Sequence, residues 1–160
     1  MISASRLTVV FAGLFVLSSL SGAAVAKGPV DVIEFSGTEF EQTLSVIEGD
    51  ALLDFNPWGQ EFLGARLDSK PSGLLEPLTV TMYLDNSVGT PEAIYRFEYY
   101  PAPDGGSIYL PGPGEADYDL NKTTILGGSG NWFDASPSWD SLYQSLVSIR
   151  PPSTGDGGLK

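Results

Sequence analysis

Apolar and polar residues alternate along much of the chain, and a period of two predicts β-strands. The alternation is clearest over residues 93–100, where three aromatic side chains share one face and the other face is more polar. The aromatic residues are Tyr95, Phe97 and Tyr99. Residues 78–84 show the same alternation, with apolar positions separated by threonine and tyrosine. Both segments therefore predict strands with one buried face.

Shorter stretches of this pattern lie between turn-forming residues and predict further strands. Residues 101–106 contain Asp-Gly and Gly-Gly pairs, which supply the positive φ angles of a tight hairpin. Residues 107–110 are therefore expected to return antiparallel to residues 93–100. The remaining predicted strands cover residues 30–35, 40–46, 51–55 and 117–126.

The segment at residues 139–150 fits two patterns. Its apolar residues recur at spacings of three and four, which is typical of a helix that Ser138 could cap. These residues are Trp139, Leu142, Tyr143, Leu146 and Ile149. Alternate positions also fit a strand, and the serines and valine of the segment are weak helix formers. We interpret the segment as a strand.

The chain breakers are spread along the sequence rather than gathered in one linker. All 12 prolines and all but two of the 19 glycines follow residue 26, which leaves little room for helices of average length. Short strands with turn signals at this spacing predict an all-β fold. We expect residues 27–150 to form a single antiparallel barrel of about eight strands, with a β-sandwich as the alternative.

The first 26 residues are typical of a secretory signal peptide. Arg6 provides a short positive region, and residues 7–20 are an apolar run broken only by small or hydroxyl residues. Ala24-Val25-Ala26 has the small-x-small pattern of a cleavage site. We therefore expect a secreted protein that has no membrane association after the signal is removed. Residues 151–160 are rich in proline, glycine and serine, and we expect a disordered tail.

Composition excludes several classes of function. The 160 residues include no cysteine and no histidine, so disulfides, zinc fingers, thiol nucleophiles and a Ser-His-Asp relay are excluded. The net charge of −12 argues against nucleic-acid binding, because phosphate recognition needs a basic surface. It also favours a neutral or cationic partner over an anionic one. An enzyme of this composition would have only Asp, Glu, Lys and Tyr as acid–base groups.

A glycine-rich segment carries a family resemblance. Residues 125–136 read ILGGSGNWFDAS, and Gly127, Gly128 and Gly130 permit the positive φ angles of a structural turn. The segment resembles the Gly-Gly-Thr-Gly-x-Phe-x-x-Ala signature of the allene oxide cyclase and dirigent-like barrels. Ser129 replaces the threonine, and Phe133 lies one position later than the aromatic residue of that pattern. With the strand order upstream, the resemblance covers about residues 78–150.

The resemblance implies an eight-stranded barrel with a ligand cavity, assembled as a homodimer or homotrimer. Dirigent proteins steer the coupling of phenoxy radicals, and allene oxide cyclases close an unsaturated epoxide. Both work without a metal or organic cofactor, so the resemblance implies none here. The pocket carboxylates of the family lie outside the glycine motif, and no catalytic residue is carried over to this chain.

The candidate ligand-binding residues are Arg96, Glu98, Tyr100 and Trp132. The first three lie on the same face of the aromatic strand. In a barrel this row could form a polar spot inside an apolar cavity. In the alternative arrangement the row faces water and the aromatic face forms the core. Trp132, together with Trp58 and Trp139, could either stack on sugar rings or close the ends of the fold.

Two further motifs concern residues 117–128. Asn121-Lys122-Thr123 is a sequon for N-glycosylation, which would be used in a eukaryotic host. Asp117, Asp119 and Asn121 have the opening spacing of an EF-hand calcium loop. Lys122 and Gly128 replace the glycine and glutamate that this loop requires, so no metal site is predicted.

Two functions follow from these observations. The first is a secreted barrel that binds a small apolar or aromatic molecule and guides its reaction in a dirigent-like or cyclase-like manner. The alternative is a non-catalytic β-sandwich module that binds glycans or a surface partner through loops that carry tryptophan. The two differ in whether the fold encloses a cavity.

Overall fold

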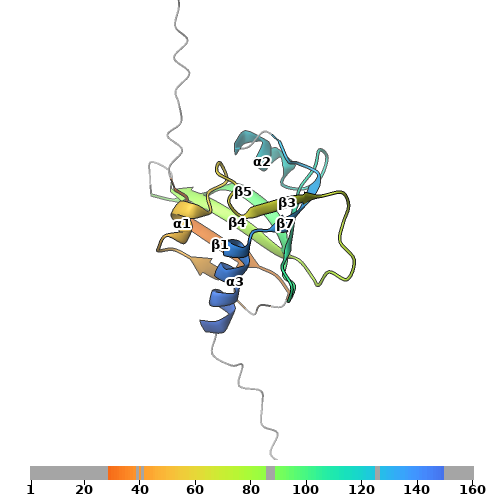
Figure 1. Ribbon diagram of the computed structural model, residues 1–160. Coiled ribbons are helices and arrows are strands. Elements are labelled where there is room, and N and C mark those ends of the chain that lie inside the picture. Colours follow the sequence, from red (N-terminus) through yellow and green to blue (C-terminus); the bar gives the residue numbers. More distant parts are fainter. Residues whose placement is uncertain (1–28, 39, 41, 86–88, 125–126, 150–160) are drawn as a thin grey trace, which may run out of the picture.

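The computed structural model describes residues 29–149 except 39, 41, 86–88 and 125–126 (Figure 1). The strands are β1 (Val32–Ser36), β2 (Leu44–Val46), β3 (Leu63–Leu67), β4 (Leu78–Asp85), β5 (Pro91–Tyr100), β6 (Ser107–Leu110) and β7 (Asn131–Ala135). The helices are α1 (Ala51–Asp54), α2 (Tyr118–Thr124) and α3 (Pro137–Ile149). The predicted signal peptide and tail lie outside the described residues.

The seven strands form one antiparallel sheet in the order β2-β1-β4-β5-β6-β7-β3. The prediction of an all-β fold is confirmed, because the fold is mostly strand. The prediction of a closed barrel is wrong: β2 and β3 lie at opposite edges, and no described strand joins them. A sandwich is also wrong, because the described residues contain a single sheet. The segment that we expected to supply a last strand forms α3 instead.

One face of the sheet, which we call the inner face, packs against α3 and α1 (Figure 1). The alternating apolar positions of the central strands point to this face and are fully buried. They are Ile33, Phe35, Leu78, Val80, Met82 and Ile108. Trp139 of α3 lies at the centre, with ring centroids 5.2 Å from Phe35 and 5.6 Å from Phe97. The helix therefore covers the inner face that a second sheet or a barrel wall would otherwise cover.

Helix α3 replaces the strand that we predicted over residues 139–150. Trp139 and Tyr143 are four residues apart and both are buried, so the helical spacing matches one apolar surface. The cap is Ser136 rather than Ser138, because the Ser136 hydroxyl accepts a hydrogen bond from the Trp139 amide at 3.2 Å. Asp140 then ties the helix to the β5–β6 turn by accepting hydrogen bonds from the Gly106 amide and the Tyr99 hydroxyl.

Two other predicted strands are also helical. Residues 51–55 contain α1, and Leu52 of the helix and Phe55 directly after it are buried in the core. Residues 117–126 contain α2, which lies beside the part of β5 that β6 does not reach. The predictions at 30–35, 78–84, 93–100 and 107–110 are confirmed by β1, β4, β5 and β6, whereas of the segment 40–46 only Leu44–Val46 is a strand, β2. Strands β3 and β7 were not predicted.

No helix in the described part of the chain has the length and apolar character needed to cross a membrane.

Candidate functional site

The sheet face opposite α3, which we call the outer face, carries a row of functional side chains. Thr79 of β4 pairs with Glu98 of β5, and Glu98 pairs with Tyr109 of β6. Tyr109 in turn pairs with Trp132 of β7. Cross-strand partners point to the same side of a sheet, so these four side chains form one line across four strands.

Three aromatic rings form a cluster at one end of this row. The ring centroids of Tyr100 and Trp132 are 5.1 Å apart, and those of Tyr109 and Trp132 are 4.9 Å apart. The Lys70 ammonium lies 5.4 Å from the Tyr100 centroid and 5.3 Å from the Trp132 centroid. Lys70 belongs to the segment between β3 and β4. The cluster is therefore an aromatic surface with a cation over it.

Each tyrosine of the cluster donates a hydrogen bond to a carboxylate. The Tyr100 hydroxyl donates to Glu98 at 2.6 Å, and the Tyr109 hydroxyl donates to Glu115 at 2.7 Å. Burial and then the Glu98 hydrogen bond and charge raise the pKa of Tyr100 well above its ordinary value. Burial, followed by the hydrogen bond to Glu115, raises the pKa of Tyr109 to about 12. Both phenols are therefore protonated donors at neutral pH.

Glu115 is fixed by two donors. Its Oε2 atom accepts hydrogen bonds from the Gly112 amide at 2.7 Å and from the Tyr109 hydroxyl. The Gly112 amide and then the Tyr109 hydroxyl lower the pKa of Glu115 from its ordinary 4.5. The carboxylate is therefore ionised throughout the neutral range.

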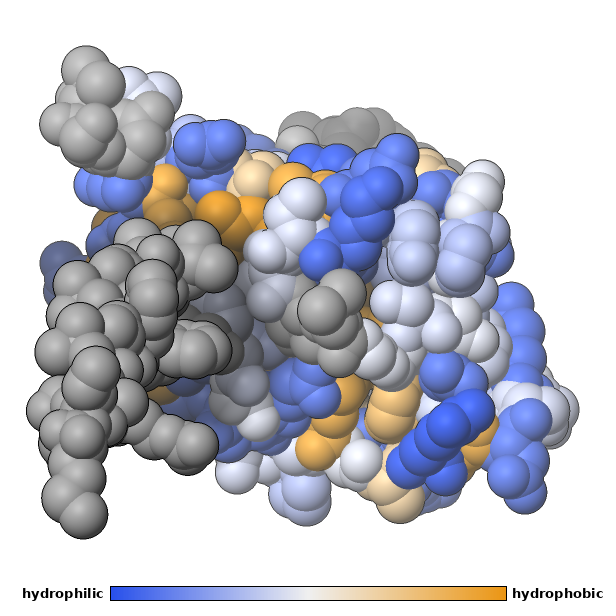
Figure 2. All heavy atoms as spheres, turned by 90° about the horizontal axis from the view of Figure 1, so that it is seen from above, coloured by the Kyte–Doolittle hydropathy of each residue, from blue (hydrophilic) through white to orange (hydrophobic). Residues whose placement is uncertain are grey.

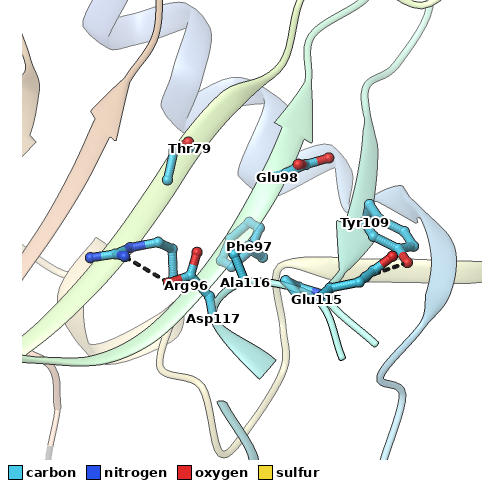
Figure 3. Close-up of a pocket in the computed structure, with 9 residues that line it drawn as sticks. Thr79, Arg96, Phe97, Glu98, Tyr109, Glu115, Ala116 and Asp117 are labelled. Atoms are coloured by element: carbon cyan, nitrogen blue, oxygen red, sulfur yellow. Dashed lines mark hydrogen bonds and ion pairs between the residues drawn. The ribbon is translucent and has the colours of Figure 1, made fainter. Parts of the chain in front are cut away.

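A hollow of about 160 Å³ lies on this face, and Tyr109 is the residue of the aromatic cluster that lines it. Figure 3 shows Tyr109 together with Glu98 and Glu115 at this hollow. Its polar lining includes Arg96, Glu98, Glu115 and Asp117. Arg96 does not present a free cation, since its guanidinium pairs with Asp117 at 2.7 Å and donates to Thr81 at 3.0 Å. The lining thus has more negative than positive groups. Figure 2 shows that the surface seen from above is largely hydrophilic, with only small separate apolar areas.

Asn121 has a structural role that the sequence did not indicate. Its side-chain oxygen accepts a hydrogen bond from the Arg96 amide at 2.8 Å, and its amide nitrogen donates to the Arg96 carbonyl at 2.6 Å. Thr124 donates to the Ile94 carbonyl at 2.6 Å. Helix α2 therefore provides hydrogen-bond partners for backbone groups of β5 that lie beyond the end of β6.

The glycosylation prediction for Asn121 is incompatible with this arrangement. The residue is 2% exposed, and the nitrogen that would carry the glycan is engaged with β5. The other residues of the calcium-like spacing also have partners: Asp117 pairs with Arg96, and Asp119 pairs with Lys122. The described residues contain no group of carboxylates arranged to hold a metal ion.

The glycine-rich segment forms the turn that leads into β7. Gly127, Gly128 and Gly130 have φ angles of 122°, 75° and 73°. The Gly130 amide donates to the Leu110 carbonyl at 2.7 Å, and Asn131 holds the turn by donating to the Gly128 carbonyl at 3.0 Å. The turn thereby sets the register that places Trp132 beside Tyr109.

The four candidate ligand-binding residues lie on one face, but not inside a lumen. Arg96, Glu98 and Tyr100 project from alternate positions of β5 on the outer face, and Trp132 contacts Tyr100 there. The inward-pointing arrangement that a barrel would give this row is therefore wrong, and the row lies on the face opposite the core. Among the tryptophans, Trp139 is fully buried in the core, so it cannot display a ring to a sugar.

Several residues of the site were missed from the sequence. The alternation of β6 does contain a signal for Tyr109, because Tyr109 lies between the apolar residues Ile108 and Leu110 and must therefore point to the opposite face of the sheet. Glu115 and Lys70 belong to connections between strands, where periodicity gives no signal.

Comparisons with known proteins found no matching family model, no matching curated protein and no matching solved structure. The resemblance to the allene oxide cyclase and dirigent-like family therefore stays a prediction.

Proposed function

We propose that this protein binds a small molecule and that the outer sheet face is its binding site. The observation that carries the proposal is that Glu98 and Tyr109 line the hollow, while the rings of Trp132 and Tyr100 extend the same surface from Tyr109. Aromatic surfaces combined with a few placed polar groups are typical of small-molecule sites.

The side chains favour a ligand with a flat or apolar part and hydrogen-bond donors. The rings of Trp132 and Tyr109 offer the apolar surface, and the carboxylates of Glu98 and Glu115 offer acceptors. Since Arg96 is engaged with Asp117, an anionic ligand would find no free guanidinium in the hollow. The net charge of −12 also favours a neutral or cationic ligand.

The size of the site favours a small ligand. The hollow measures about 160 Å³, which is well below the roughly 300–1,000 Å³ of pockets for drug-sized molecules. A single-ring aromatic molecule fits this scale better than an oligosaccharide. Guidance of a reaction, secretion and assembly as a dimer or trimer remain predictions from the sequence.

Ligand-observed NMR tests the proposal. Single-ring neutral and cationic aromatic molecules, together with monosaccharides, are screened against the folded protein by saturation transfer. We expect aromatic molecules to bind and Trp132→Ala to weaken their binding. Trp58→Ala is the matched control, because Trp58 lies in the turn after α1. Equal loss in both variants would contradict the proposed site, and selective binding of monosaccharides would favour the glycan alternative instead.

A further inference from the structure

The Lys70 ammonium shows what the aromatic cluster can accommodate. It lies at nearly the same distance from two rings, 5.4 Å from the Tyr100 centroid and 5.3 Å from the Trp132 centroid. With Lys70 in place Tyr100 is 6% exposed and Trp132 is half-buried. A positively charged nitrogen therefore already occupies the position over the paired rings.

The rings are the only partners of this ammonium group in the described part of the chain. Lys122, by comparison, also lies over a ring, 5.9 Å from the Tyr118 centroid, but its ammonium is paired with Asp119 at 2.7 Å. Lys70 is exposed and forms no ion pair with a described residue. Its position over the rings is therefore held by a weak interaction that another cation could replace.

The surroundings of the two rings are negative. Glu98 accepts the hydrogen bond of the Tyr100 hydroxyl, and the charge of Glu76 also acts on Tyr100. These carboxylates add a Coulomb attraction for a cation placed over the rings. No carboxylate among the described residues is paired with the Lys70 ammonium, so the position offers ring surface rather than ionic hydrogen bonds.

We propose that Tyr100 and Trp132 form a binding site for the alkylated ammonium group of a small molecule, and that Lys70 is an internal occupant which this ligand displaces. The inference rests on the proposed function for the choice of face and adds the chemical class of the ligand. A primary ammonium is strongly hydrated and gains little from ring faces alone. An alkylated ammonium keeps its charge, carries apolar methyl groups and suits an aromatic surface.

The test measures binding of tetramethylammonium at constant ionic strength, by NMR titration of the protein. Lys70→Gln removes the internal occupant, and we expect the affinity to rise by about two- to fivefold, the range that corresponds to one exposed cation–π interaction. Lys122→Gln is the matched control, since it removes the same charge from another lysine over a tyrosine ring. We expect it to leave the affinity nearly unchanged.

tert-Butanol, a neutral molecule of similar shape, serves as the second probe. We expect it to bind more weakly than tetramethylammonium. Equal affinities for the two probes, or a Lys70→Gln affinity no higher than that of the unchanged protein, would overturn the ammonium site. The Lys70 variant keeps the test decisive even if changes at Trp132 impair folding, because the Lys70 side chain is exposed.

Failure of this inference is distinguishable from failure of the proposed function. If neutral aromatic molecules bind at Trp132 while tetramethylammonium does not, the ammonium site is wrong and the small-molecule site stands. If neither class of probe binds at the outer face, both are wrong.

Discussion

Asn121→Ala separates the structural role of this residue from its apparent role as a glycosylation site. The side chain of Asn121 makes two hydrogen bonds to the backbone of Arg96 and is 2% exposed. Alanine can make neither bond. The change leaves the Arg96 amide and carbonyl without partners at a point where β6 does not pair with β5.

The magnitude follows from the cost of unpaired buried groups. Each costs about 1–3 kcal/mol, and two such groups give an upper bound near 6 kcal/mol. Water entry beside α2 reduces this figure, and alanine regains roughly 0.5 kcal/mol through its higher helix propensity. We therefore expect the free energy of unfolding to fall by about 2–4 kcal/mol, a large share of the 5–15 kcal/mol typical of a domain.

The assay is urea unfolding of the unglycosylated protein, followed by tryptophan fluorescence and circular dichroism. Thr123→Ala is the control, because it destroys the same sequon while leaving both Asn121 hydrogen bonds intact. Its own hydroxyl bonds only to the Leu120 carbonyl and is exposed, so we expect a change within about 0.5 kcal/mol. Equal stability of the Asn121 variant and the unchanged protein would refute the role assigned to Asn121.

Three further predictions concern the turn, the core and the site. Gly128→Val should lower the free energy of unfolding in urea by about 1–2 kcal/mol, because the φ angle of Gly128 is 75° and a Cβ there would lie 3.1 Å from a Leu110 methyl group. An unchanged midpoint of urea unfolding would contradict the conformation assigned to the turn. Trp139→Ala should lower the free energy of unfolding, followed by circular dichroism, by about 3–5 kcal/mol. Trp139→Phe should lower it clearly less, because phenylalanine keeps an aromatic ring and removes a buried indole N–H that has no partner among the described residues. Equal losses in the two variants would contradict the packing described. Because the pKa of Glu115 is lowered on folding, its stabilising effect is complete above its ordinary 4.5 and is lost as the pH falls through the lower folded value. Glu115→Gln should therefore flatten the acid side of the stability profile, and an unaltered profile in acid titrations would argue against the Tyr109 and Gly112 contacts.

The strands with strict alternation could be predicted because one of their faces is buried. Tyr95 and Phe97 had to share a face, and their position in the core fixes Arg96 and Glu98 on the other. The sequence thus identified a row of candidate binding residues that does lie together. The row lies on the face away from the core, which is the usual place for the more polar side chains of a half-buried strand.

The helices were harder to predict because their apolar spacing fits more than one structure. Tyr143 and Val147 are four apart, which suits a helix face and equally the alternate positions of a strand. Packing of Trp139 against the inner face decides between the two, and that contact joins distant parts of the chain. Because residues 137–149 form a helix, they cannot supply a strand between β2 and β3, and the sheet of the described residues stays open.

The partners of the site residues depend on tertiary structure alone. Asn121 reads as an exposed sequon, yet β6 pairs with β5 only at residues 98–100 and leaves the backbone groups of Arg96 for Asn121 to bind. Lys70 comes from a connection with no periodic pattern, and only the folded chain places it over Tyr100 and Trp132.

One NMR titration tests the central claim most directly. The indole N–H signals of Trp132, Trp139 and Trp58 report on the outer face, the core and the turn after α1, respectively. On addition of benzyltrimethylammonium, which combines a ring with an alkylated ammonium, we expect a saturable shift of the Trp132 signal while the other two signals stay in place. A saturable shift of the Trp139 signal with Trp132 unmoved would place binding inside the fold and contradict the account.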